Sequence, residues 1–162
     1  MINLTPPLVR ARLSCQLTLR KHPPVAIWKQ LMRFSCQPGC TRCCTQEGWV
    51  YLSVEDLPRL AAFLGISVDE LLRRHVYSTK HTLRLRRERG RCPFLKAEGC
   101  SVHPAKPTQC REFPFWPELI EDEKELEETA RWCPGIGKGD TVPVEMLEES
   151  ARTMKKSYPH MY

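Results

Sequence analysis

The chain has 162 residues, 41% of them hydrophobic and 27% charged, and its formal net charge is +6. This length suits one domain with a modest core. No run approaches the ~20 apolar residues that a membrane-spanning helix needs. The N-terminal sequence also lacks the apolar stretch and small-residue cleavage site of a secretory signal. We therefore expect a cytoplasmic protein that makes no contact with a membrane.

Nine cysteines are the most distinctive feature of the composition. Structural disulfides are rare in the cytosol, and an odd number of cysteines cannot pair completely. Clustered cysteines in a cytosolic protein indicate metal ligands or redox groups. The fourteen prolines indicate long ordered loops, which a bound metal would help to hold together.

In chain order, residues 1–24 are predicted to form an N-terminal arm, and residues 25–162 a single cysteine-cluster domain. Residues 25–33 could form two helical turns, and residues 49–53 have the composition of a strand. The clearest pattern covers residues 53–77, which predict a helical hairpin with apolar residues at helical spacing. Capping boxes open its helices at Ser53 and Ser67, and Gly65 is suited to end the first helix.

The second half of the chain has weaker patterns. Polar and apolar residues alternate over 82–86, which predicts a half-exposed strand. Residues 92–117 are rich in loops, with a short helix expected at 108–112. Two further helices are expected over 118–131 and over 144–158. The run Gly-Ile-Gly-Lys-Gly at 135–139 lacks the full phosphate-loop motif, so we expect a turn there. The predicted fold is small, α+β, mostly helical and loop-rich, and organised around a cysteine-ligated metal centre.

Four cysteines lie within nine residues, at positions 36, 40, 43 and 44. The Cys40-x-x-Cys43 spacing lets two sulfurs reach one ion, and Pro38-Gly39 supplies a tight turn before it. The adjacent Cys43 and Cys44 would point to opposite sides of an extended segment. They would then serve two sites, or two irons of one cluster, or one would remain a free thiol.

A second group of cysteines is spread over residues 92–133, mostly beside turn residues. Buried, unligated thiols are the alternative reading of this group. His103 is a weaker candidate, and we expect Cys15, alone in the arm, to bind nothing. We predict eight metal ligands: Cys36, Cys40, Cys43, Cys44, Cys92, Cys100, Cys110 and Cys133.

Thiolates suit both Zn²⁺ and iron–sulfur clusters. The nearly all-cysteine donor set and the adjacent cysteine pair favour an iron–sulfur cluster, [4Fe-4S] above all, and zinc remains open. The catalytic residues, if there are any, are unknown.

Charge is unevenly distributed along the chain. A basic strip, residues 73–91, contains eight Lys and Arg residues against Glu88 alone, and an acidic segment follows at residues 118–131. Aromatic residues are not interleaved with the arginines, as they would be in a strand that binds single-stranded nucleic acid. We therefore expect the two segments to complement each other, within the molecule or across a dimer, and no tight nucleic-acid binding.

The cysteine segments together resemble a known family. Phe34–Cys44, Cys92-Pro-Phe-Leu, Gly99–Trp116 and Cys133-Pro-Gly are similar to the cysteine cluster of the YkgJ-type family, a zinc- or iron-chelating domain. The resemblance covers about residues 34–139. This chain departs from the family pattern by one extra residue before Cys40. It also has His103 where the family usually has an aromatic residue, and Lys106 where the family usually has Arg.

The resemblance implies metal binding and does not by itself define a cellular role. The well-known enzymatic association of the family is flagellin lysine N-methylation, in longer chains, so a related metal-dependent enzyme is the first alternative. No S-adenosylmethionine site is recognisable in this sequence. A basic nucleic-acid-binding adaptor with a structural metal is the second alternative. The sequence does not identify a protein partner.

Overall fold

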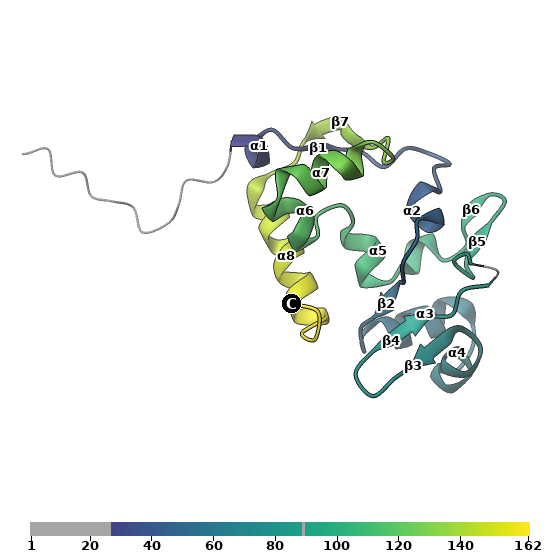
Figure 1. The fold of residues 1–162 in the computed structure, drawn as a ribbon. Helices are drawn as coiled ribbons and strands as arrows, with labels where there is room; N and C mark the ends of the chain where they lie inside the picture. Colours follow the sequence, from purple (N-terminus) through teal and green to yellow (C-terminus); the bar gives the residue numbers. More distant parts are fainter. Residues whose placement is uncertain (1–26, 89) are drawn as a thin grey trace, which may run out of the picture.

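The computed structural model describes residues 27–88 and 90–162. The predicted arm, residues 1–24, lies outside the described residues together with Cys15. The described part contains both helices and strands, with more helix than strand, as the sequence predicts (Figure 1). No helix among the described residues has the length and apolar character needed to cross a membrane.

The predicted helical hairpin is confirmed as α3 (Asp56–Leu64) and α4 (Val68–His75). Gly65 ends α3 in the left-handed region, with φ 67°. The Ser67 hydroxyl accepts a hydrogen bond from the Glu70 N–H at 3.1 Å, which caps α4. The second helix ends two residues earlier than predicted, because the β-branched Val76 begins a strand.

That strand belongs to an antiparallel sheet that covers the hairpin. The sheet has the order β2 (Tyr51–Leu52), β4 (Leu83–Leu85), β3 (Val76–Ser78). A two-stranded hairpin, β5 (Leu95–Lys96) and β6 (Gly99–Cys100), follows. The buried residues of these elements form what we call the hairpin core: Leu52, Leu57, Leu60, Ala61, Leu71, Val76, Leu85, Phe94, Val102 and Ala105.

A second cluster of buried residues surrounds the long helix α8 (Val144–Ser157), which the sequence predicts closely. It is contributed by the segment after α1 (Ile27–Gln30), by α6 (Pro117–Glu121) and by α8 itself. We call it the α8 core: Met32, Ile120, Val142, Leu147 and Ala151. Burial in two separate clusters leaves room for the cysteine loops between them.

The predicted acidic helix over 118–131 is two helices, α6 and α7 (Glu123–Ala130). The Asp122 carboxylate accepts a hydrogen bond from the Lys124 N–H at 2.9 Å and so caps the start of α7. A side chain that caps a helix start competes with helix continuation, which explains the break.

The predicted turn at 135–139 is wrong. Residues Ile136–Thr141 form strand β7, which pairs antiparallel with β1 (Arg33–Phe34). A Cβ atom on Gly135 would lie 2.6 Å from the Ser35 carbonyl oxygen, so only glycine allows the two segments to come this close. The pairing holds the first cysteine segment beside Cys133.

The expected pairing of basic and acidic segments within the chain is also wrong. Among the described residues, no ion pair joins the basic strip to the acidic segment 118–131. Figure 1 shows β3 and β4 at the opposite end of the molecule from α7. Arg84 instead stacks on two aromatic rings, with its guanidinium carbon 3.9 Å from the Trp49 ring centroid and 4.7 Å from that of Tyr77.

Short elements connect the two cores. They are α2 (Arg42–Thr45), the 3-10 turn η1 (His103–Ala105) and α5 (Thr108–Glu112). The sequence predicts α5 with the bounds that are observed. Figure 1 shows α2 and α5 in the middle of the molecule, between the hairpin with its sheet and the α8 region.

Candidate metal centre

All eight cysteines of the described residues are free thiols, and all face one of two adjoining cavities between the cores. The larger cavity has a volume of about 370 Å³ and the smaller about 110 Å³. Three cysteines line only the larger cavity, namely Cys44, Cys92 and Cys100. Cys133 lines only the smaller one, and four line both: Cys36, Cys40, Cys43 and Cys110.

The first cysteine segment folds as its spacing predicts up to Cys40. The Cys40 N–H donates to the Gln37 carbonyl at 3.1 Å, closing a turn in which Gly39 has φ 72°. Beyond it the prediction fails, because Cys43 and Cys44 lie in the short helix α2 and not in an extended segment. Their thiols hydrogen-bond each other. The adjacent pair therefore does not point to opposite sides.

Three cysteines of the second group lie close together in the fold. Cys100 is in β6, where it pairs with Leu95. Cys92 lies in the turn just before β5, and its carbonyl accepts a hydrogen bond from the Leu95 N–H at 3.1 Å. Both cysteines pack against the hairpin core. Cys110 lies in the middle of α5. Residues 18 positions apart in sequence are thus brought to one cavity, as expected for loop ligands.

Three thiols form a hydrogen-bonded chain with Cys44 in the middle. The hydrogen bond with Cys44, together with the nearby Lys106 ammonium, lowers the pKa of Cys43 to about 6. A second hydrogen bond with Cys44 lowers the pKa of Cys100 to about 6. The same two contacts, with Cys100 first, raise the pKa of Cys44. Near neutral pH two of the three are thus thiolates, which is the form that binds metal.

The remaining thiols differ in depth. Burial raises the pKa of Cys110, and the charges of Cys92, Cys43 and Cys100 raise it further. Burial also raises the pKa of Cys92 and of Cys133. A thiol of this kind gives up its proton when its sulfur binds a metal ion, so metal binding here releases protons.

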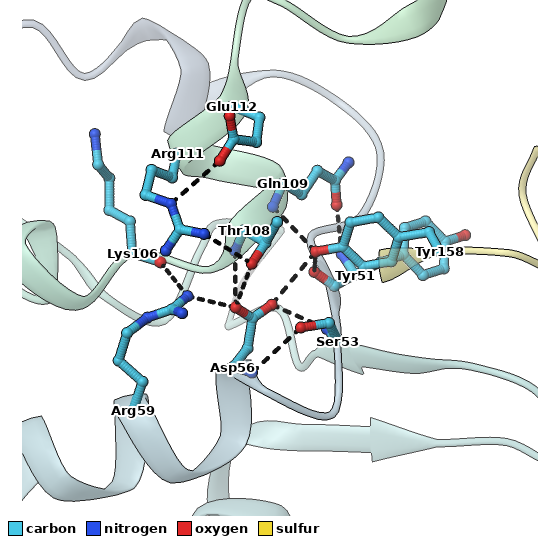
Figure 2. Close-up of polar contacts among 10 residues, drawn as sticks. All are labelled: Tyr51, Ser53, Asp56, Arg59, Lys106, Thr108, Gln109, Arg111, Glu112 and Tyr158. Atoms are coloured by element: carbon cyan, nitrogen blue, oxygen red, sulfur yellow. Dashed lines mark hydrogen bonds and ion pairs between the residues drawn. The ribbon is translucent and has the colours of Figure 1, made fainter. Parts of the chain in front are cut away.

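Other side chains at the cavities give the site a mixed charge. Lys106 lines both cavities, and Figure 2 shows its side chain directed away from the neighbouring polar network. Among the described residues, Glu47 is the only carboxylate that lines either cavity. His103 lines the larger cavity, where it remains a candidate nitrogen ligand. The donors are therefore overwhelmingly sulfur.

A buried carboxylate fixes the elements that carry this site (Figure 2). Asp56 is 0% exposed. It accepts hydrogen bonds from the Ser53 N–H at 2.9 Å and from the Thr108 N–H and hydroxyl at 2.9 and 2.8 Å. Arg59 forms an ion pair with it and also donates to the Lys106 carbonyl at 2.8 Å. The carboxylate thus joins the helical hairpin to the start of α5.

The same network reaches the end of α8. The Tyr158 hydroxyl lies 3.3 Å from an Asp56 carboxylate oxygen and accepts a hydrogen bond from the Gln109 N–H at 3.0 Å. The Gln109 side chain in turn accepts from the Tyr51 N–H at 2.6 Å. Burial, and then the charge of Asp56, raise the pKa of Tyr158. Residues Gln109 and Cys110 are thereby held between the two cores.

Sequence reasoning identifies Asp56 only as part of a capping box. That box is present, since the Asp56 N–H donates to the Ser53 hydroxyl at 3.3 Å. The contacts with Thr108 and Tyr158 span 52 and 102 residues of sequence. No local pattern could have indicated them.

The donor set fits a thiophilic metal. Cysteine sulfur is the preferred ligand of zinc in structural sites and of iron–sulfur clusters. The thiols surround shared space, although within residues 27–88 and 90–162 no three Cys, His, Asp or Glu side chains are drawn together closely enough to form a complete ion site.

Comparison with known proteins agrees with this chemistry. Residues 35–134 match the model of the CxxCxxCC family, whose description is "putative zinc- or iron-chelating domain". The chain belongs to this family. The matched segment begins just before Cys36 and ends just after Cys133, so it includes all eight thiols at the two cavities. No solved structure matches this chain.

Proposed function

We propose that this CxxCxxCC-family protein binds zinc or an iron–sulfur cluster through its eight cavity cysteines, in the cytoplasm, and that the metal joins its two cores. The observation that carries the proposal is the convergence of eight thiols from four separate segments on two adjoining cavities. Chance burial of cysteine as a small hydrophobe would distribute the thiols through the cores. Of the eight cysteines in the described residues, only Cys133 is buried, with 8% of its surface exposed.

The charges around the thiols support the same proposal. Lys106 faces both cavities, where it offsets the negative charge that a thiolate-bound metal centre carries. Two thiols, Cys43 and Cys100, have pKa values lowered to about 6. Metal can thus be captured at neutral pH without first removing a proton from every ligand.

Anaerobic purification followed by measurement of iron, acid-labile sulfide and zinc tests this proposal. A brown protein with matching iron and sulfide identifies a cluster, and a colourless protein with stoichiometric zinc identifies a zinc site. We expect Cys40→Ser and Cys43→Ser each to hold less metal than the parent protein. The control Cys15→Ser, outside the described residues, should keep it. A parent protein that retains no metal under any preparation contradicts the proposal.

A second candidate function is a metal-dependent enzyme related to flagellin lysine N-methylase. The observation that favours it is the size of the larger cavity, about 370 Å³, which falls within the range of ligand pockets. Aromatic side chains form part of its lining, including Trp49, Phe113 and Trp132. Equilibrium dialysis of the metal-loaded protein with S-adenosylmethionine tests this function. Saturable binding supports it, and no binding at millimolar concentration contradicts it.

A further inference from the structure

The eight thiols are held by two different parts of the fold. One group is attached to the hairpin core. Cys100, in β6, and Cys92, in the turn just before β5, both pack against that core. Cys44 hydrogen-bonds Cys100, the larger of its two thiol contacts, and also Cys43. The Cys110 thiol interacts electrostatically most with Cys92, and also with Cys43 and Cys100. Three of these four thiols, all except Cys110, line only the larger cavity.

The other group is attached to the β1–β7 pair beside the α8 core. The Ser35 N–H donates to the Gly135 carbonyl at 3.1 Å, which places Cys36 next to the loop that follows Cys133. Arg42 also donates to the Trp132 carbonyl at 3.3 Å. These contacts hold the whole segment 36–43 against the loop of Cys133.

The lining of the smaller cavity includes all four thiols of this second group. Cys133 lines only this cavity, where Cys36, Cys40 and Cys43 join it together with Cys110. The Cys133 thiol interacts electrostatically with Cys40 and Cys43. The spacings 36-x₃-40 and 40-x₂-43 are within the range of zinc-binding cysteine pairs.

The boundary between the two groups of thiols lies between the adjacent residues Cys43 and Cys44. Neighbouring side chains on a helix diverge by about 100°, because the helix has 3.6 residues per turn. In α2 this divergence gives Cys43 access to both cavities and Cys44 access only to the larger one. Seven thiols line the larger cavity and five the smaller, with four in common. Dividing the eight thiols by the part of the fold that holds them gives two groups of four, the number that one tetrahedral metal ion or one four-iron cluster takes.

From this arrangement we infer two adjoining four-thiol metal sites. The first, the hairpin site, consists of Cys44, Cys92, Cys100 and Cys110. The second, the strand site, consists of Cys36, Cys40, Cys43 and Cys133. The inference rests on the proposed function, and it adds the number of metal centres and the ligands of each. Helix α2 belongs to both sites, so it connects the two centres and thereby the two cores.

Zn²⁺ is the probe that tests the inference, because single ions count sites directly. We expect apo protein reconstituted with Zn²⁺ under reducing, anaerobic conditions to retain two ions per chain after desalting. Cys92→Ser should retain one ion, Cys133→Ser should retain one, and the double variant should retain none. Cys15→Ser, the matched control, should retain two.

Titration of the parent with Co²⁺ gives a second measurement that does not depend on the folding of the variants. We expect the absorption of thiolate-bound tetrahedral Co²⁺ to rise until two equivalents are bound. Saturation at one equivalent, or complete loss of zinc from both single variants, overturns the two-site inference and leaves one shared centre. Failure of the parent to bind any metal would instead overturn the proposed function itself.

Discussion

Asp56 shows how one buried side chain determines the position of a metal-binding element. Its carboxylate has no access to solvent and accepts hydrogen bonds from the backbone and hydroxyl of Thr108, the first residue of α5. Cys110 lies two residues further along. A buried carboxylate with several donors is stabilising only while all its partners remain, because each orphaned donor costs free energy.

We therefore predict that Asp56→Ala lowers the free energy of unfolding by about 3 kcal/mol, because it leaves the buried Thr108 donors without their acceptor and removes the ion pair with Arg59. The matched control is Asp69→Ala, an exposed acid in the first turn of α4, which should cost less than about 1 kcal/mol. Urea unfolding of both variants measures the difference. Equal stabilities of the two variants would show that the Asp56 network does not support the fold.

The elements fall into two classes, those with local signals and those without. The capping contact at Ser67, the glycine end of α3 and the bounds of α5 follow from residues within a few positions of one another. The sequence predicts all three. The β1–β7 pair was missed because its partners are about 100 residues apart and Gly-Ile-Gly-Lys-Gly shows no apolar alternation.

The candidate site divides in the same way. The eight cysteines could be found because their chemistry is distinctive and their spacing is local. Their grouping could not, because it depends on the β1–β7 pair and on the depth of each thiol. The helical conformation at Cys43 and Cys44 also had no signal in the sequence, since two adjacent cysteines favour neither helix nor strand strongly.

Strand β4 carries Arg84, an arginine of the basic strip whose contacts the sequence did not predict. Alternation along the strand predicts that Arg84 and Arg86 share a solvent face. In the structure Arg86 is exposed, whereas Arg84 is partly buried and stacks on Trp49 and Tyr77. Tyr77 lies directly opposite Arg84 in the β3–β4 register. Arg84 thus contributes to the sheet and is not simply a surface charge.

We predict that Arg84→Ser lowers the free energy of unfolding by about 1–2 kcal/mol, since two cation–π contacts contribute about 0.5–1 kcal/mol each. Arg86→Ser should change it by less than about 0.5 kcal/mol, as ordinary surface substitutions do. Thermal or urea unfolding of the two variants decides the matter, and the metal content of both should equal that of the parent. An Arg86 variant as unstable as the Arg84 variant would contradict this role of the stacking.

At the scale of the whole molecule, two hydrophobic cores share few buried residues, and the cysteine segments lie between them. The polar network of Asp56 and Tyr158 is one connection between the cores, and the proposed metal sites are the other. Structural zinc contributes roughly 10 kcal/mol or more in small modules, which is comparable to the total stability of a typical domain. Loss of metal should therefore do more than weaken the protein uniformly.

We predict that metal removal separates the unfolding of the two cores. With metal bound, unfolding by urea should be one cooperative transition, with the same midpoint by tryptophan fluorescence and by far-ultraviolet circular dichroism. After treatment with a strong chelator, the two signals should separate and the first transition should move to lower urea concentration. Each core keeps its own buried apolar residues, but α2 and the cysteine loops no longer connect them.

Two controls accompany this prediction. Addition of Zn²⁺ should restore the single transition. The chelator should have no effect on a Cys40→Ser/Cys92→Ser variant, which lacks one ligand of each site. Coincident transitions with an unchanged midpoint in the chelated parent would show that the metal does not join the cores.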